Sequence, residues 1–413
     1  MINVSIWGHR VGTIIPSPKS GYYAFLYDKA FVRSGIQIAP ISMSLAGEPY
    51  FFGDLPLSEY YGLPPVFADS LPDSFGSSLI DAWLRSKGLV RQEITALDRL
   101  AYLGRRGIGA LTYEPEHSLS RSGSSALDMR ILVEEARSVL NGELAREDGV
   151  SALRHIIRVG SSAGGAQAKA VVGWNRESDM FMLGDRDLPE GFEHWIVKFT
   201  PPEYPWRGER EYEVYLKAKD AGINISESRL CEVDGIRHFM TRRFDRAGRS
   251  RHHVQTLSAM ANFPMSVPLE FRTYERLFAT AEELRLGYES KEELFRRMVF
   301  NVAVGECDDH TKNFSFILAE GDEWKLAPAY DLTGGSFPSA DPWSAHVGRH
   351  QLSVNGKFAD ISEKDLMAVA EQFAIGTAGS ILKDVFRLHK TPRKILRTRV
   401  QYVASHGLAE AVH

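Results

Sequence analysis

The residues best suited to carry chemistry lie in two polar segments of the carboxyl-terminal half. In the first, four residues separate Asp308 from Asn313 in a loop between a helix-like segment and an apolar run. Catalytic loops of protein kinases have this spacing; their aspartate accepts the proton of the substrate hydroxyl and their asparagine binds magnesium. In the second, Asp331 ends a short strand-like segment and precedes two glycines, as the second magnesium ligand of kinases does. The two segments together predict a phosphoryl-transfer site.

Each of these residues alone has a simpler interpretation. A loop aspartate or asparagine more often caps a helix or stabilises a turn through its side chain. A short hairpin over residues 314–328 would bring Asp308 and Asp331 to one site. Magnesium prefers hard oxygen ligands, often one or two carboxylates together with phosphate oxygens, so Asn313 and Asp331 are adequate ligands.

Three further features lie upstream in the order of a kinase amino-terminal lobe. Residues 160–169 are rich in Gly, Ala and Ser between two strand-like segments, and small residues let backbone amides approach a phosphate. Lys198 lies on a strand of bulky residues, and the next helix offers Glu209, Glu211 and Glu213. In kinases a strand lysine paired with a helix glutamate orients the nucleotide phosphates. The alternatives are a glycine-rich hairpin turn, an edge-strand charge and a solvated helix face.

The elements that must position these residues change along the chain. The first hundred residues contain short strand-like segments and helix-like segments at 78–87 and 96–103, and the polar stretch 114–127 marks a boundary. Strands alternate with glycine turns from about residue 154, a helix is expected over 209–221, and the pattern beyond residue 258 is mostly helical. We therefore predict an α+β protein with a β-rich subdomain over 1–120, a lobe containing the glycine-rich loop over 128–257 and a helical lobe over 258–413.

Composition excludes several classes of protein. With 413 residues, 44% hydrophobic and 25% charged, the chain has the composition of a soluble globular protein rather than a disordered or fibrous one. Its net charge of −4 provides no overall field for holding nucleic acid or an anionic membrane. The two cysteines, Cys231 and Cys307, are too far apart for a zinc cluster of the usual spacing. No apolar run is long enough to span a bilayer and no leader is recognisable, so we expect a cytoplasmic protein.

Taken in chain order, these features are those of an ATP-dependent phosphotransferase, and the longer motifs identify a family. The chain resembles the HipA family, the kinase toxins of bacterial type II toxin–antitoxin systems. Residues 162–169 are similar to the family's Ser-x-x-Gly-x-Gln-x-Lys loop, and residues 308–313 to its Asp-Gly-His-x-Lys-Asn catalytic loop. Residues 67–76, 243–246 and 353–357 also match family motifs. The resemblance implies a two-lobed protein-kinase-like fold behind an amino-terminal β-rich subdomain.

The resemblance also implies roles for individual residues. Asp308 would be the catalytic base, and Asn313 and Asp331 would bind Mg²⁺. Ser162 aligns with the serine that family members autophosphorylate to inactivate themselves, with the adjacent Ser161 as the alternative. Contacts to ATP would come from the glycine-rich loop, the strand lysine with its helix glutamate, the region of the adenine hinge and the catalytic loop: Ser162, Gly164, Gly165, Ala166, Gln167, Lys169, Lys198, Glu211, Arg243, Phe244, His310 and Lys312. Glu211 is the preferred partner of Lys198, with Glu209 and Glu213 not excluded.

The sequence departs from the family pattern in places. Asp309 replaces the usual glycine after the catalytic aspartate, and its carboxylate could bind metal or raise the pKa of Asp308 by like-charge repulsion. Arg242 stands where many members have glutamate, and residues 251–255 replace a more acidic segment. These changes affect the expected nucleotide contacts and the preference for a peptide substrate.

The partners expected from the resemblance are a HipB-like helix-turn-helix antitoxin and a protein substrate, with an aminoacyl-tRNA synthetase as one candidate. Operator DNA would be reached mainly through the antitoxin. A basic cluster near the carboxyl-terminal end is either a solvated helix face or a contact to the phosphate backbone; it includes Arg393, Lys394, Arg397 and Arg399. Two other functions remain open from the sequence, a nucleotide-sensing co-repressor with little catalysis and a phosphotransferase for small-molecule hydroxyls.

Overall fold

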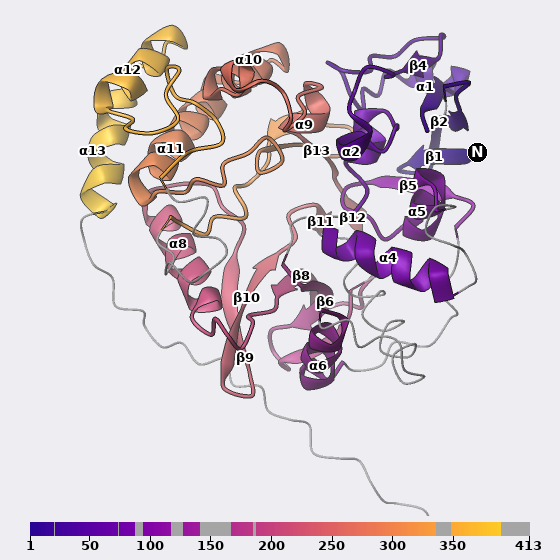
Figure 1. Cartoon of the computed structure of the whole chain (residues 1–413), viewed down its shortest axis with the longest axis horizontal. Helices are drawn as coiled ribbons and strands as arrows, with labels where there is room; N and C mark the ends of the chain where they lie inside the picture. The colour runs from indigo at the N-terminus through magenta and orange to yellow at the C-terminus, as the bar shows by residue number, and fades with distance from the viewer. Residues whose placement is uncertain are drawn as a thin grey trace, which may run out of the picture.

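Alternating apolar and polar residues in the first strands build a sheet with one buried face. In β1 (Ile2–Ile6) the side chains of Ile2, Val4 and Ile6 are buried, whereas those between them are partly exposed. The computed structural model describes residues 1–19, 21–72, 74–86, 94–116, 127–140, 167–184, 187–335 and 348–389 (Figure 1). The first sheet is antiparallel in the order β4-β3-β2-β1-β5, its other strands being β2 (His9–Pro16), β3 (Tyr23–Tyr27), β4 (Tyr50–Phe51) and β5 (Leu111–Glu114).

Short helices complete this amino-terminal module. They are α1 (Lys29–Ser34), α2 (Leu57–Tyr60), α3 (Pro65–Ala68) and α5 (Ala96–Leu103). Helix α5 begins at a capping box in which Thr95 and Asp98 each accept a hydrogen bond from the backbone amide of the other, and it ends at Gly104. The buried side chains of these helices join those of the sheet in one hydrophobic core, so the module has its own interior.

A second antiparallel sheet carries the strand lysine. Its order is β7-β6-β8-β10-β9, with β6 (Lys169–Asn175), β7 (Met180–Leu183), β8 (Phe192–Lys198), β9 (Ser228–Val233) and β10 (Ile236–Arg242). Residues of α4 (Ser74–Ser86) and α6 (Met129–Leu140) share a hydrophobic core with Trp195 and Val197 of β8. Helix α8 (Arg207–Asp220) packs against β9 and β10. Side chains alternate along a strand, so Lys198 faces away from the core that holds Val197.

The remaining part is mostly helical, as the sequence predicts. It contains α9 (Leu257–Met260), a 3₁₀ turn (Leu269–Phe271), α10 (Tyr274–Glu283), α11 (Tyr288–Val304), α12 (Glu363–Gln372) and α13 (Ala378–His389). A three-stranded sheet in the order β13-β14-β15 lies beside them, formed by β13 (His253–Thr256), β14 (Ser315–Leu318) and β15 (Lys325–Leu326). A two-stranded ribbon, β11 (Arg246–Ala247) with β12 (Ser250–Arg251), precedes them. The predicted α+β class is confirmed, and the hairpin expected over residues 314–328 is present as β14 and β15.

The amino-terminal module is hydrogen-bonded to the rest of the chain. Trp7 Nε1 donates to the carbonyl of Arg251 at 2.6 Å, and Trp324 Nε1 donates to the carbonyl of Gln37 at 3.0 Å. The backbone amide of Gly109 donates to the buried Asp245 carboxylate at 2.8 Å. In Figure 1 the module lies beside α9 and β13, on the side of the molecule opposite α12 and α13. The module is therefore in direct contact with the part of the chain that carries the catalytic-loop motif.

Candidate active site

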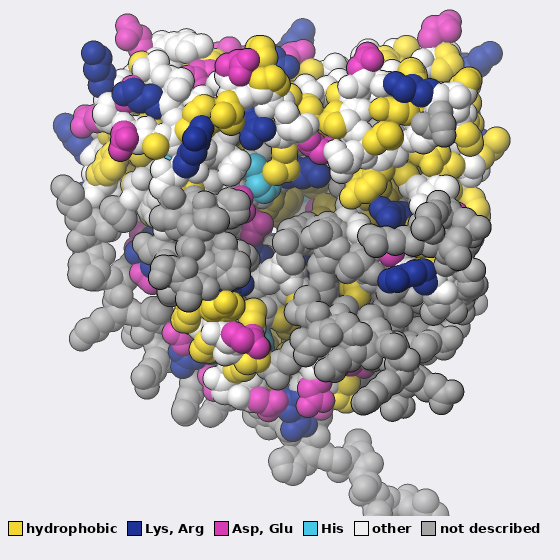
Figure 2. Space-filling model, in the orientation of Figure 1, with side chains coloured by type: hydrophobic (Ala, Val, Ile, Leu, Met, Phe, Trp, Pro, Cys, Tyr) yellow, Lys and Arg dark blue, Asp and Glu magenta, His cyan; other side chains and the backbone are white. Residues whose placement is uncertain are grey.

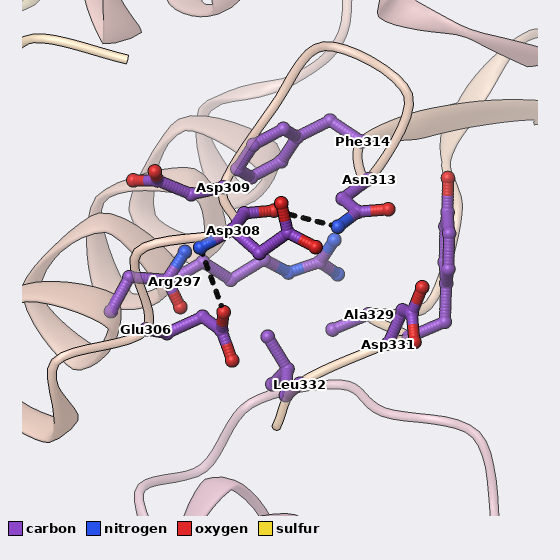
Figure 3. Close-up of a pocket in the computed structure, with 11 residues that line it drawn as sticks. Arg297, Glu306, Asp308, Asp309, Asn313, Phe314, Ala329, Asp331 and Leu332 are labelled. Carbon is purple, nitrogen blue, oxygen red and sulfur yellow. Dashed lines mark hydrogen bonds between the residues drawn. The ribbon is translucent and has the colours of Figure 1, made fainter. Parts of the chain in front are cut away.

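The two polar segments singled out by the sequence line one pocket. Figure 2 shows a hollow in the middle of this face of the molecule, where acidic and histidine side chains are visible. The pocket lies between the loop after α11 and the segment after β15, and Figure 3 shows Asp308 and Asp331 on opposite sides of it. Its lining comprises Arg297, Asn301, Glu306, Asp308, Asp309, Asn313, Phe314, Ala329, Tyr330, Asp331 and Leu332.

The loop with Asp308 begins where α11 stops. Gly305 ends that helix in the left-handed region at φ 68°, a conformation in which glycine carries little penalty. Asn313 Nδ2 donates to the carbonyl of Asp308 at 2.7 Å, and the amide of Lys312 donates to Nδ1 of His310 at 3.2 Å. The side chain of Asp308 keeps half of its surface exposed. The asparagine of the motif therefore fixes the loop while the Asp308 carboxylate remains accessible.

Asp331 is presented to the pocket from the other side. The β14–β15 hairpin returns the chain to the pocket, and Asp331 adopts the left-handed conformation at φ 56°, which aspartate tolerates better than most residues. The preceding Tyr330 donates its hydroxyl to the carbonyl of Lys312 at 2.6 Å and stacks obliquely on Phe244, with ring centroids 5.7 Å apart. The hairpin thereby ties Asp331 to the loop that carries Asp308.

Lys198 joins Asp331 to helix α8. Its ammonium group forms ion pairs with the carboxylates of both Glu211 and Asp331. Glu209 instead pairs with Arg237, and Glu213 pairs with Arg210 and Lys217, so Glu211 is the helix acid that meets Lys198. The edge-strand interpretation of Lys198 is wrong, because β8 lies between β6 and β10 in the middle of the sheet.

The charges of these three groups depend on one another. Burial alone would lower the pKa of Lys198, but the carboxylates of Asp331 and Glu211 outweigh it and keep the lysine protonated. Burial would raise the pKa of Asp331, but Lys198 and Lys169 hold it at about 2. For Glu211, burial dominates and raises the pKa to about 7, although Lys198 opposes the shift. At neutral pH the protonated Lys198 is thus held by an ionised Asp331 and by Glu211, whose pKa is higher than that of Asp331.

Glu306 is a site residue that the sequence reasoning missed. This buried carboxylate accepts hydrogen bonds from the amides of Asp308, Thr333 and Gly334, at 3.0 Å from Asp308 and 2.7 Å from Gly334 (Figure 3 shows the first). It therefore joins the Asp308 loop to the segment that follows Asp331. Its place directly after the glycine that ends α11, two residues before Asp308, was the available signal.

Replacing Glu306 with glutamine is expected to flatten the pH dependence of stability. Burial raises the pKa of Glu306 from 4.5 to about 7 against the effect of the three amides, so the folded chain binds more protons than the unfolded chain between these values. The resulting stabilisation is complete below pH 4.5 and is lost as the pH rises through 7; at about 1.4 kcal/mol per pKa unit it amounts to about 3 kcal/mol. Urea unfolding gives the free energy of unfolding of wild type and of Glu306→Gln at pH 5 and at pH 8, with Glu211 present in both proteins. If this free energy changed equally with pH in the two proteins, Glu306 would be ionised throughout.

Asp309, which departs from the family motif, has a buried and hydrogen-bonded carboxylate. Its buried carboxylate accepts hydrogen bonds from the hydroxyl of Tyr274 at 2.7 Å and the amide of Gln351 at 2.7 Å, and it lies 2.8 Å from Nδ1 of His350. Figure 3 shows it pointing away from the carboxylates of Asp308 and Asp331. These partners anchor the catalytic-loop segment to α10 and to residues 350–351.

The remaining expected contacts divide into two groups. Phe244 packs against Tyr330, which lines the pocket. The buried Arg243 guanidinium instead pairs with Asp245 at 2.7 Å and donates to the carbonyl of Gly107. Arg243 thus holds the amino-terminal module rather than lining the pocket. The departure at Arg242 places that side chain in an exposed ion pair with Glu193.

The glycine-rich loop is described only at its carboxyl-terminal end. Gln167 Nε2 donates to the carbonyl of Phe199 at 3.0 Å, and the buried Lys169 lies opposite Lys198 in the β6–β8 register. These contacts place the end of the loop beside the strand lysine. Expected residues outside the described ranges are Ser161, Ser162, Gly164, Gly165, Ala166 and, in the basic cluster, Arg393, Lys394, Arg397 and Arg399.

Comparison with protein families agrees with this arrangement. A model of the HipA-like C-terminal domain matches residues 161–402, and a model of the HipA N-terminal domain matches residues 2–114. The chain belongs to the HipA family. The N-terminal match contains every strand of the first sheet, and the C-terminal match contains every residue that lines the pocket.

Curated relatives of this chain match over part of their length. A protein of Haemophilus influenzae named "Putative kinase" is 27% identical over 156 residues, which is 35% of this chain and 46% of the relative. "Putative kinase Y4dM" of Sinorhizobium fredii is 23% identical over 201 residues, 43% of this chain and 49% of the relative. The chain therefore matches about half the length of each of these relatives.

A solved HipA structure has the same fold. HipA of Shewanella oneidensis, in a complex with HipB and operator DNA, superposes with a TM-score of 0.67 at 17% identity and covers 96% of this chain and 92% of its own. The protein-kinase-like fold of HipA is thus the fold of this chain. Within the described ranges, none of the helices has both the length and the apolar character needed to cross a membrane.

Proposed function

We propose that the chain is an ATP- and magnesium-dependent serine/threonine protein kinase that acts as a growth-arresting toxin. The observation that carries the proposal is the convergence of five groups from four parts of the chain. Asp308 and Asn313 come from the loop after α11, Asp331 from the segment after β15, Lys198 from the central strand and Glu211 from α8. Few chemistries other than phosphoryl transfer require this set.

In this mechanism the chain's own groups position the reactants and move one proton. Asp308, accessible at the pocket, orients a substrate serine or threonine hydroxyl and accepts its proton as the oxygen attacks the γ-phosphorus and the bond to the bridging oxygen breaks. Lys198 places a fixed positive charge near the nucleotide phosphates, and Glu211 holds that ammonium group in place.

The donor set fits magnesium. Asn313 and Asp331 offer the hard oxygen ligands that this ion prefers, and they are the residues that would hold it. Among the described residues, no cluster of three or more His, Cys, Asp and Glu side chains could form an all-protein metal site. Sharing with phosphate oxygens is the usual arrangement for Mg²⁺, which when bound neutralises charge on the transferred phosphoryl group.

The proposed regulation and partners are those that membership of the family supports. Phosphorylation of Ser162, or of Ser161, would place nearly two negative charges next to the nucleotide phosphates and would inactivate the kinase. The neighbouring structure contains HipB and operator DNA, which supports a HipB-like antitoxin as partner here and operator DNA as its target. A protein substrate, with an aminoacyl-tRNA synthetase as one candidate, completes the proposal.

The test is intact-mass and phosphosite analysis of the purified chain after incubation with MgATP. Wild-type protein is expected to gain about 80 Da on Ser162 or Ser161, the mass that a phosphate adds in place of a hydroxyl hydrogen. Addition of EDTA and the variant Asp331→Asn should each prevent the gain, because EDTA removes the Mg²⁺ and the variant removes the carboxylate of its two proposed ligands. The starting mass shows whether the sample was already phosphorylated.

Other outcomes distinguish the alternative functions. If dephosphorylated wild type gains no phosphate and phosphorylates no protein of a bacterial extract, the kinase proposal is overturned. Transfer of label to metabolites alone would identify a small-molecule phosphotransferase, and ATP binding without any transfer would identify a nucleotide-sensing co-repressor.

A further inference from the structure

The amino-terminal module contacts the start of α9, a segment that is hydrogen-bonded to the catalytic loop. Helix α3 packs against α9, and Asp69 directly follows α3. Its carboxylate accepts two hydrogen bonds from Thr256, one from the backbone amide at 2.7 Å and one from the hydroxyl at 2.8 Å. Thr256 is also the residue that caps α9, through a hydrogen bond from the amide of Ala259. Asp69 therefore holds both the backbone amide and the side-chain hydroxyl of Thr256, the residue that caps α9.

The residues after Thr256 are bonded directly to the catalytic loop. The amide of Leu257 donates to the carbonyl of Phe314 at 2.7 Å, and the amide of Ser258 donates to the carbonyl of Thr311 at 3.2 Å. Thr256 itself lies opposite Ser315 in the β13–β14 register. The loop from Asp308 to Asn313 is thus supported on this side by the beginning of α9, which Asp69 holds.

Two further contacts show that this support is close to the site. The hydroxyl of Tyr60, on α2, lies 3.0 Å from both the carbonyl and the hydroxyl of Ser258, next to the Thr256 contact. Burial raises the pKa of Asp69, and Thr256 and the charge of Lys312 oppose that shift, so the carboxylate is within electrostatic reach of the catalytic loop. On the other side, Tyr330 donates to the carbonyl of Lys312. The loop is therefore held between the module and the segment after β15 that carries Asp331.

A second acidic residue of the module provides a natural comparison. Glu59 accepts hydrogen bonds from the amides of Met265 and Ser266, at 2.6 and 2.9 Å, and so also ties the module to the helical lobe. That segment follows α9 rather than preceding it, and Met265 and Ser266 are not the residues whose amides support the loop. Asp69 and Glu59 thus both connect the module to the helical lobe, but only Asp69 does so next to the amides that support the catalytic loop.

We propose that Asp69 is a positioning residue for phosphoryl transfer, through which the amino-terminal module sets the geometry of the catalytic loop by way of Thr256 and the start of α9. The proposal rests on the kinase function proposed above. A displacement of about 1 Å at a reacting group can cost about a hundredfold in rate. The module would then be part of the catalytic machinery, and a partner that moves it could alter turnover without entering the pocket.

The experiment compares Asp69→Ala with Glu59→Ala by hydrogen–deuterium exchange and by kinase kinetics. In Asp69→Ala the amides of residues 257–258 and 308–313 should exchange faster than in wild type, because their support is weakened. Turnover should fall by about 10- to 100-fold, with the KM for ATP changed by less than about threefold. Glu59→Ala should leave both the exchange of these amides and turnover at the wild-type level.

Two more variants keep the proposal open to refutation. Asp69→Asn can still accept the Thr256 amide and should recover most of the turnover; equal loss in Asp69→Asn and Asp69→Ala would mean that the charge near Lys312 matters, and not the positioning. Tyr60→Phe removes one hydroxyl from the same contact and should raise exchange of residues 257–258 and 308–313 above the wild-type level. This variant tests the route even if Asp69→Ala fails to fold, and wild-type exchange in Tyr60→Phe would contradict it. Equal effects of Asp69→Ala and Glu59→Ala would reduce Asp69 to a simple tether. Exchange is measured without ATP, so it tests the proposal even if wild type transfers no phosphate.

Discussion

Replacing Asp308 with asparagine lowers the rate of phosphoryl transfer by about 10²- to 10⁴-fold, the range of a general base, while MgATP binding stays within a few-fold of wild type. The variant keeps the size of the side chain but cannot accept the substrate proton. The loop should keep its shape, because its bonds to Glu306 and Asn313 use the backbone amide and carbonyl of Asp308. Initial rates of transfer of labelled γ-phosphoryl measure the first quantity, and calorimetry with a non-hydrolysable ATP analogue and Mg²⁺ measures the second.

Asp322→Asn is the matched control for this experiment. Asp322 lies in the turn between β14 and β15, where it pairs with Lys325 at the surface, so the same chemical change there should leave turnover unaltered. Wild-type turnover in Asp308→Asn would assign the base elsewhere. His310 would then be the first candidate, because its Nε2 lies 3.8 Å from the Asp308 carboxylate.

Local sequence signals were sufficient for most of the secondary structure around the site. The helix end at Gly305 and the apolar β14 follow from residue types a few positions apart. The strand expected to end in Asp331 is shorter than that, because β15 ends at Leu326 and Ala329 forms only an isolated bridge with Ile225. The choice of Glu211 could also have been made more firmly. Glu211 shares its helical face with the buried Val214, Tyr215 and Ala218, at spacings of three, four and seven residues, whereas Glu209 and Glu213 do not.

Features that depend on distant segments could not be read from the sequence. The central position of Lys198 is set by pairing of β8 with β6 and β10, and no local pattern in residues 192–198 distinguishes this from an edge strand. The environment of Asp309 is formed by Tyr274 and His350, and that of Asp69 by Thr256, each from a different part of the chain. The contact of Arg243 with Asp245 was the exception, since both lie in the Arg-Phe-Asp-Arg motif and a local ion pair was a reasonable expectation.

Replacing Lys198 with methionine should reduce both stability and turnover. The change leaves Glu211 and Asp331 close together without their shared cation, and breaking a buried ion pair on one side typically costs about 3–5 kcal/mol. Lowering the pH from 8 to 5 should recover part of this loss, because Glu211, whose pKa burial already raises, can then take up a proton. Turnover should fall by at least about a hundredfold at either pH, because a fixed charge at the transferring phosphates is lost. Urea unfolding at both pH values and phosphoryl-transfer rates measure these effects.

Two further variants separate the structural cost from the chemical one. Arg237→Met breaks another ion pair between a strand and α8, that of Arg237 with Glu209. This pair is partly exposed and outside the pocket, so the free energy of unfolding should change by less than about 1 kcal/mol and turnover should not change. In Lys198→Met/Glu211→Gln the second substitution removes one of the two uncompensated carboxylates, which should restore part of the stability and none of the activity, a non-additive result expected for groups in direct contact. If the double variant regained turnover as well, Lys198 would serve only to neutralise its two carboxylates. The charge acting on the phosphates would then come from Lys169, which lies opposite Lys198 on the neighbouring strand β6.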